Sequence, residues 1–91
     1  MDEVVITRSL DSEEIREKGI DKWPVWEKEA SEFEWYYDTE ETCYIITGRV
    51  TVVTDNGNTH EFGKGDLVTF KQGLRCTWRI HEGVRKHYKL G

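Results

Sequence analysis

From residue 33 onward, hydrophobic and polar residues alternate in short runs separated by turn residues. Runs with a period of two that are rich in β-branched and aromatic residues are typical of strands with one buried face. Such short strands at regular spacing predict an all-β sandwich or closed barrel. The predicted strands are Phe33–Tyr37, Glu41–Thr47, Arg49–Thr54, Thr59–Phe62, Leu67–Phe70, Leu74–His81 and Val84–Leu90.

The turns between these runs carry their own signals. Asp55-Asn56-Gly57-Asn58 predicts a hairpin, because Asn-Gly tolerates the positive φ that tight hairpin turns require. Gly48 and the pair Glu82-Gly83 are predicted to end strands in the same way.

Residues 1–22 have a different pattern. A short β-prone run, Val4–Thr7, precedes a helix that Asp11 would cap at its N-terminus and Gly19 at its C-terminus. Pro24 then places the aromatic segment around it at a strand start or a sheet edge. We expect one domain over residues 1–91, with a short N-terminal strand and helix in 1–22 and a barrel in 23–91.

Composition narrows the class of partner. Asp and Glu outnumber Lys and Arg by 18 to 13, so a net charge of −5 argues against binding to nucleic acid or an anionic membrane. No apolar run approaches the roughly 20 residues that span a bilayer, and the start Met1-Asp2-Glu3 is unlike a secretory signal. We expect a cytoplasmic protein in which Cys43 and Cys76 are thiols. The charged fraction of 34% also suits a thermophile.

Two spacings point to a family. Glu41 is followed by six residues and Gly48, and Gly65 by five residues, then Lys71-Gln72-Gly73, two more residues and Cys76. This resembles the two motifs of the cupin superfamily, and nearly the whole chain resembles the small cupins related to ureidoglycine aminohydrolase and ethanolamine-utilisation proteins. The resemblance implies a single jelly-roll β-barrel and a homodimer formed through an apolar outer sheet face.

The chain departs from the family at the metal site. Cupins usually hold a metal with three His and one Glu, but here the first two His positions fall on Trp35 and Tyr37, or on Glu34 and Tyr36 with one more spacer. The last His position is Cys76, so Glu41 alone matches. We therefore expect no cofactor; a divalent metal, if one binds, would be held by Glu41 and Cys76.

Strand parity suggests which side chains share the interior. Glu41 and Cys43 lie on one face, and Cys76 would enter the same cavity from the facing sheet. The alternative is that both thiols simply fill the core as small apolar groups. A buried Glu41 needs a partner, and Lys86 or Arg75 could supply it.

Three functions remain open. The first is a metal-free module that binds a small metabolite. The second is an enzyme resembling ureidoglycine aminohydrolase, with Glu41 as general base or metal ligand and Lys86 or Tyr37 steering an anionic substrate. The third is a structural or regulatory protein with a vestigial pocket, which a filled interior would favour. The predicted binding residues are Trp35, Tyr37, Glu41, Cys43, Cys76, Trp78 and Lys86, although the aromatic ones could instead be core filling.

Overall fold

The computed structural model describes residues 3–91, and strands make up most of them. The helical part is confined to α1 and the short 3₁₀ turn η1 (Ile20–Lys22). In order, the strands and the helix are β1 (Val4–Thr7), α1 (Ser12–Lys18), β2 (Val25–Lys28), β3 (Ser31–Tyr36), β4 (Glu41–Thr54), β5 (Thr59–Gly63), β6 (Leu67–Phe70) and β7 (Arg75–Leu90).

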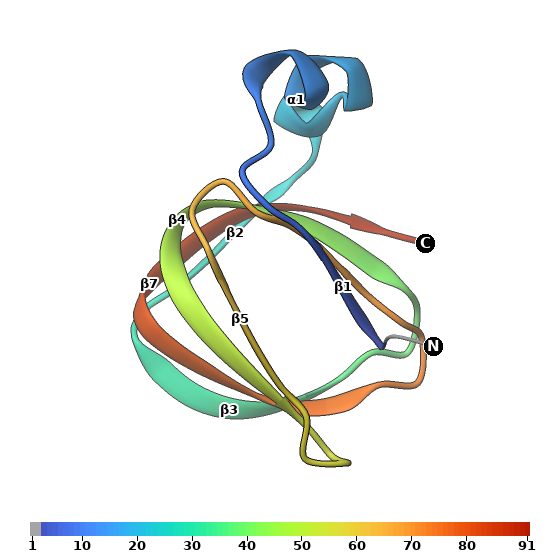
Figure 1. Ribbon diagram of the computed structural model, residues 1–91, viewed down its shortest axis with the longest axis vertical. Helices are drawn as coiled ribbons and strands as arrows, with labels where there is room; N and C mark the ends of the chain where they lie inside the picture. The colour runs from blue at the N-terminus through green and yellow to red at the C-terminus, as the bar shows by residue number, and fades with distance from the viewer. Residues whose placement is uncertain (1–2) are drawn as a thin grey trace.

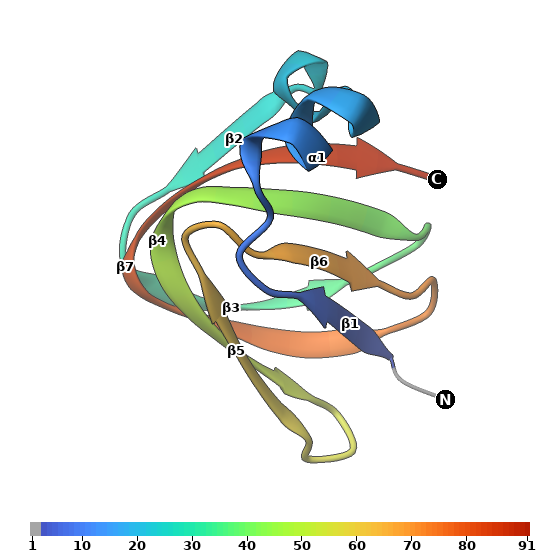
Figure 2. The same cartoon turned by 45° about the horizontal axis from the view of Figure 1, so that its top comes forward.

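Helix α1 begins and ends where the capping residues predict. The Asp11 carboxylate accepts a hydrogen bond from the Glu14 backbone N–H, 2.8 Å away. Gly19 ends the helix in the left-handed region, at φ +69°. The helix and η1 lie together beyond one end of the strands, as Figures 1 and 2 show.

The predicted strand breaks at Gly48 and Glu82-Gly83 are wrong, because β4 and β7 run through them as strands of 14 and 16 residues. The two strands shift register against one another between Ile45 and Val50. Gly48 has φ +108°, and a Cβ placed on it would lie 2.6 Å from the Gly83 carbonyl oxygen. These glycines therefore let two paired strands bend and approach closely, rather than ending them.

The bend divides β4 and β7 between two layers. The first half of β4 and the second half of β7 pair with each other, and β6, β1 and β2 complete that layer. The other halves pair beside β5 and β3 in the second layer. The layers curve around a common interior, which is clear in Figure 2.

The expectation of a closed barrel is corrected by the strand pairing. The hydrogen-bonded path runs β1-β6-β4-β7-β2, with β3 on β7 and β5 on β4, so the sheet of the described residues does not close. Packed layers lie about 10 Å apart, whereas a ladder needs about 4.8 Å.

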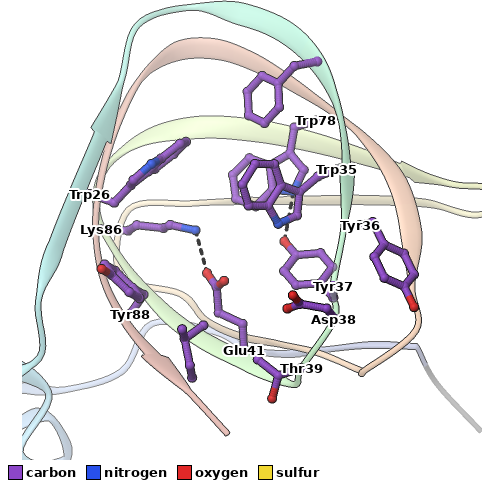
Figure 3. A pocket seen from close by; sticks show the side chains of 12 residues that line it. Trp26, Trp35, Tyr36, Tyr37, Asp38, Thr39, Glu41, Trp78, Lys86 and Tyr88 are labelled. Atoms are coloured by element: carbon purple, nitrogen blue, oxygen red, sulfur yellow. Dashed lines mark hydrogen bonds and ion pairs between the residues drawn. The ribbon is translucent and has the colours of Figure 1, made fainter.

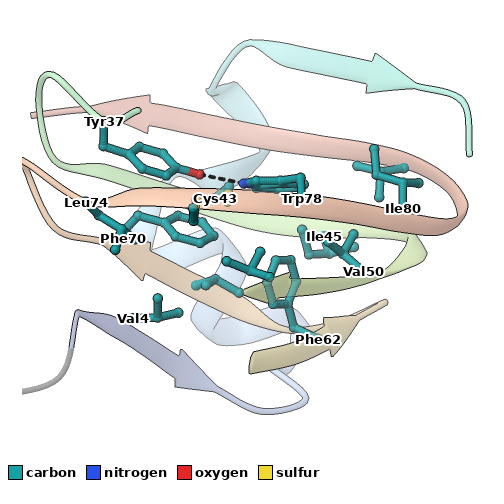
Figure 4. Close-up of a cluster of buried hydrophobic side chains, with 14 residues drawn as sticks. Val4, Tyr37, Cys43, Ile45, Val50, Phe62, Phe70, Leu74, Trp78 and Ile80 are labelled. Atoms are coloured by element: carbon teal, nitrogen blue, oxygen red, sulfur yellow. Dashed lines mark hydrogen bonds between the residues drawn. The ribbon is translucent and has the colours of Figure 1, made fainter. Parts of the chain in front are cut away.

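Buried apolar side chains fill the space between the layers (Figure 4). Phe70 and Trp78 form its centre, with ring centroids 5.7 Å apart, and Phe62 meets both rings edge-on. Cys43, Ile45, Val50 and Val52 are contributed by β4 and have no exposed surface. This core ends at the aromatic side chains that surround a cavity.

No helix among residues 3–91 has the length and apolar character needed to cross a membrane.

Candidate functional site

A cavity of about 260 Å³ opens where the edges of β2 and β3 lie beside the ends of β4 and β7 (Figure 3). Seven of its lining residues are aromatic, and its charged residues are one lysine and two acids. This cavity among residues 3–91 weighs against a vestigial pocket, for which the rings would leave no space. The lining consists of Trp26, Phe33, Trp35, Tyr36, Tyr37, Asp38, Thr39, Glu41, Trp78, Lys86, Tyr88 and Leu90.

A buried ion pair lies inside the cavity. The Lys86 Nζ donates to Glu41 Oε2 over 2.8 Å, and the two side chains are only 7% and 10% exposed. The same ammonium group lies 4.8 Å from the centroid of Trp26 and 4.7 Å from that of Trp78. Both the carboxylate and the ring faces stabilise its positive charge. Lys86, not Arg75, is thus the partner of Glu41; Arg75 lies against the ring of Tyr36 instead.

A second polar contact fixes the aromatic wall. The indole Nε1 of Trp78 donates to the Tyr37 hydroxyl oxygen over 3.0 Å, and the Tyr37 ring stacks on Phe70 with centroids 4.7 Å apart. Burial raises the pKa of the Tyr37 phenol far above its ordinary value, and the nearby Cys43 and Glu41 add to that rise. Tyr37 therefore stays a neutral hydroxyl that positions Trp78.

Strand register brings these groups together. Trp26 lies directly opposite Lys86, Phe33 opposite Trp78, and Glu41 opposite Leu90. Directly opposed residues share a face of the sheet. Strand β7 therefore places Lys86 beside Trp26 of β2, and Trp78 beside Phe33 of β3. The Lys86 side chain reaches along this face to Glu41, four residues from its own partner Ile45 on β4.

The two cysteines are placed apart from this cavity. Cys43 shares the face of Glu41 but is fully buried in the core, where burial raises the pKa of its thiol to about 12. Cys76 lies opposite Trp35 and lines a separate shallow hollow with Asp55. Burial, and then the Asp55 carboxylate, raise the pKa of the Cys76 thiol to about 11. Both groups are protonated thiols at neutral pH.

The donor set around Glu41 does not fit a cupin metal. Glu41 and Cys76 line different cavities, and the Lys86 ammonium group is bound to the carboxylate. The rings of Trp35 and Tyr37 stand where imidazoles are expected, and the Tyr37 hydroxyl already accepts from Trp78. Over residues 3–91, no three His, Cys, Asp or Glu side chains form a cluster able to hold a metal ion.

Of the predicted binding residues, five line the cavity: Trp35, Tyr37, Glu41, Trp78 and Lys86. Several lining residues were missed, although parity could have found some of them. Alternation from Lys86 places Tyr88 and Leu90 on its face, and alternation from Trp35 adds Phe33. Trp26 could not be found in this way, because its pairing with Lys86 depends on a register across 60 residues of chain.

Comparison with known proteins gives the family. The model of the EutQ-like cupin domain matches residues 15–88. A DUF861 family protein from Thermotoga maritima is 55% identical, with a TM-score of 0.94, over 98% of this chain and 100% of that one. No curated protein matches the chain.

More distant structures share the fold. A DUF861 protein of unknown function from Pseudomonas syringae pv. tomato is 31% identical over 74% of this chain and 29% of its own, with a TM-score of 0.67. A putative ethanolamine utilization protein Q from Salmonella typhimurium is 20% identical over 72% and 53%, with a TM-score of 0.66. The resemblance inferred from the two motif spacings is confirmed: the chain belongs to the EutQ-like cupin domain family.

Proposed function

We propose that this protein binds a small metabolite in the aromatic cavity without the help of a metal. The observation that carries the proposal is the ion pair of Lys86 and Glu41 inside an open cavity walled by rings. Binding sites are typically apolar hollows with a few convergent polar groups that fix the orientation of the ligand. This cavity has that composition.

The size of the cavity sets the size of the metabolite. An engineered cavity of about 150 Å³ accommodates benzene. The present cavity of about 260 Å³ accordingly suits a molecule with one or two rings, or a chain of similar bulk. Trp35 is 48% exposed at the cavity and supplies a ring face that a ligand would cover.

The metal-dependent enzyme is the rival function. It requires a metal to polarise the substrate, with Glu41 as a ligand or base. The contact between Lys86 and Glu41 weighs against this function, because the ammonium group already neutralises the carboxylate.

The first test is elemental analysis of protein purified without a His tag, with thermal melts in added Mn, Fe, Ni, Zn and Cu. We expect no stoichiometric metal and no shift in the melting temperature. A screen of small metabolites by the same melting assay should then find compounds that stabilise the native protein but not Trp35→Leu. About one metal per chain, lost in Glu41→Ala, would overturn the proposal in favour of the metal enzyme.

We propose that the protein is cytoplasmic and a homodimer. Val5 and Val25 lie on the two edge strands β1 and β2 of one layer, are 50% and 42% exposed, and point away from the core. A layer with apolar groups at both edges suits pairing with a second copy about a two-fold axis.

A further inference from the structure

The polar groups left free in the cavity indicate the chemical class of the ligand. Lys86 has three N–H donors, and Glu41 Oε2 accepts one of them. No hydrogen bond from residues 3–91 reaches Glu41 Oε1, although the Glu41 side chain lines the cavity. Figure 3 shows the Lys86 nitrogen and the Glu41 carboxylate projecting into the space that the rings surround. The cavity thus presents a hydrogen-bond acceptor beside a hydrogen-bond donor.

Resting on the proposed binding function, we infer that the ligand is a flat, uncharged ring carrying a lactam edge, in which an N–H lies next to a C=O. The ligand N–H would donate to Glu41 Oε1, and the ligand carbonyl would accept from Lys86 Nζ. The nitrogen and oxygen of a lactam edge are about 2.2 Å apart, as the amide bond lengths require. Lys86 Nζ lies 2.8 Å from Oε2, and Oε1 belongs to the same carboxylate, so the free acceptor and the donor lie side by side and can face one ring edge.

Charge excludes the two simplest alternatives. An anion would meet two carboxylates, Asp38 and Glu41, and one ammonium group whose charge is already paired. A cation that approached Glu41 Oε1 would be placed beside the Lys86 ammonium group, which repels it. A wholly apolar ligand would cover the carboxylate oxygen without giving it a donor, which costs the full desolvation of that oxygen.

The walls favour a planar body. Phe33 and Trp78 are stacked with an angle of 16° between their planes, and Trp35 meets Phe33 edge-on at 6.3 Å. The outer ring, Trp35, is exposed to the cavity and offers its surface to a stacked ligand. A flat heterocycle would contact these rings while its polar edge faces Lys86 and Glu41.

The test compares matched probes by titration calorimetry. Isocarbostyril is a two-ring lactam, and N-methylisocarbostyril has the same body without the N–H donor. Benzylamine and naphthoate serve as the cationic and anionic probes. We expect isocarbostyril to bind best, and methylation to weaken binding about tenfold or more, the effect of losing a hydrogen bond to a charged group.

Two variants separate recognition from folding. In Glu41→Gln, the ratio of the affinities for the two lactam probes should shrink toward one, whereas Trp35→Leu should weaken binding of both probes by the same factor. Thermal melts and circular dichroism establish that each variant is folded. Equal binding of the two lactams to the native protein, or preference for benzylamine or naphthoate, would overturn the lactam inference while leaving a binding pocket in place.

Binding of none of the four probes would also overturn the lactam inference. The metabolite screen described above then decides the binding function separately. A stabilising metabolite without a lactam edge preserves the proposed function, and the absence of any stabilising metabolite removes both.

Discussion

At the scale of single residues, Lys86 and Glu41 are held together by their surroundings as much as by each other. The ammonium group has a carboxylate at 2.8 Å and two indole faces within 4.8 Å. Removing one member of a buried pair leaves the other as an isolated charge, which costs far more than replacing both by apolar groups. This asymmetry makes the pair testable by a double-mutant cycle.

We expect Lys86→Met to lower the free energy of unfolding by about 3 kcal/mol at neutral pH, because Glu41 loses its partner. The double variant Lys86→Met/Glu41→Leu should recover most of that loss. Urea denaturation of the two single variants and the double variant measures the coupling. Additive effects would show that the pair contributes nothing beyond its separate side chains.

The two thiols predict a fall in stability at alkaline pH. Cys43 and Cys76 have pKa values raised to about 12 and about 11 in the native protein, above the ordinary 9.0. Below pH 9 both states are protonated, so this contribution is fully present. Between pH 9 and the native pKa values only the unfolded chain loses the protons, and stability falls with rising pH.

The size of this effect can be isolated with Cys43→Ala. Each thiol contributes up to about 1.4 kcal/mol per pH unit within its window. Unfolding free energies measured from pH 7 to 11 should fall less steeply in Cys43→Ala than in the native protein. Parallel curves for the two proteins would contradict the buried, protonated state of Cys43.

At the scale of elements, the sequence predicted where strands lie better than where they end. The alternation placed Glu41 and Cys43 on one face correctly, because parity depends only on neighbouring residues. It could not separate the carboxylate in the cavity from the thiol in the core, since parity says nothing of depth. Gly48 and Gly83 carry the same local signal whether a strand turns or bends, and only their approach to one another decides.

The bend gives a prediction with a matched control. In Gly48→Ala, the new methyl group would collide with the Gly83 carbonyl and with Val84, 2.6 Å and 2.8 Å away. Gly57 has a similar positive φ of +88° in the hairpin but nothing within 4 Å of an added Cβ. We expect Gly57→Ala to cost about 1 kcal/mol and Gly48→Ala about 3 kcal/mol or more.

Denaturant unfolding of both variants measures the difference between backbone strain alone and strain with a collision. Because the strained φ is common to both positions, the excess in Gly48→Ala reports the close crossing of β4 and β7. Equal losses in the two variants would mean that the strands separate at the bend without cost.

At the scale of the whole molecule, the open sheet leaves β1, β2, β3 and β5 as edges among the described residues. Charged side chains along β2 and β3, such as Glu27, Glu32 and Glu34, disfavour pairing with foreign strands at these two edges. Val5 and Val25 are exposed on the outer face of the layer that contains β1 and β2, and this face is available to a second copy.

We expect light scattering on a sizing column to give twice the mass of one chain. Val5→Lys should shift the protein toward the monomer, because it places a charge in the proposed interface. Tyr36→Lys is the control, since Tyr36 is also 48% exposed but lies on β3 in the second layer. A native protein that runs as a monomer would contradict the proposed homodimer.

The sharing of β4 and β7 between both layers has a consequence for the order of events during synthesis. Apart from the pair of β1 and β6, every strand pairing in the sheet involves β4 or β7, and Glu41 is paired with Leu90 at the far end of β7. While a ribosome is still making β7, the earlier strands lack the partner that completes both layers and lines the cavity. We therefore expect the nascent chain to stay protease-sensitive until β7 has emerged, and then to fold in one late step.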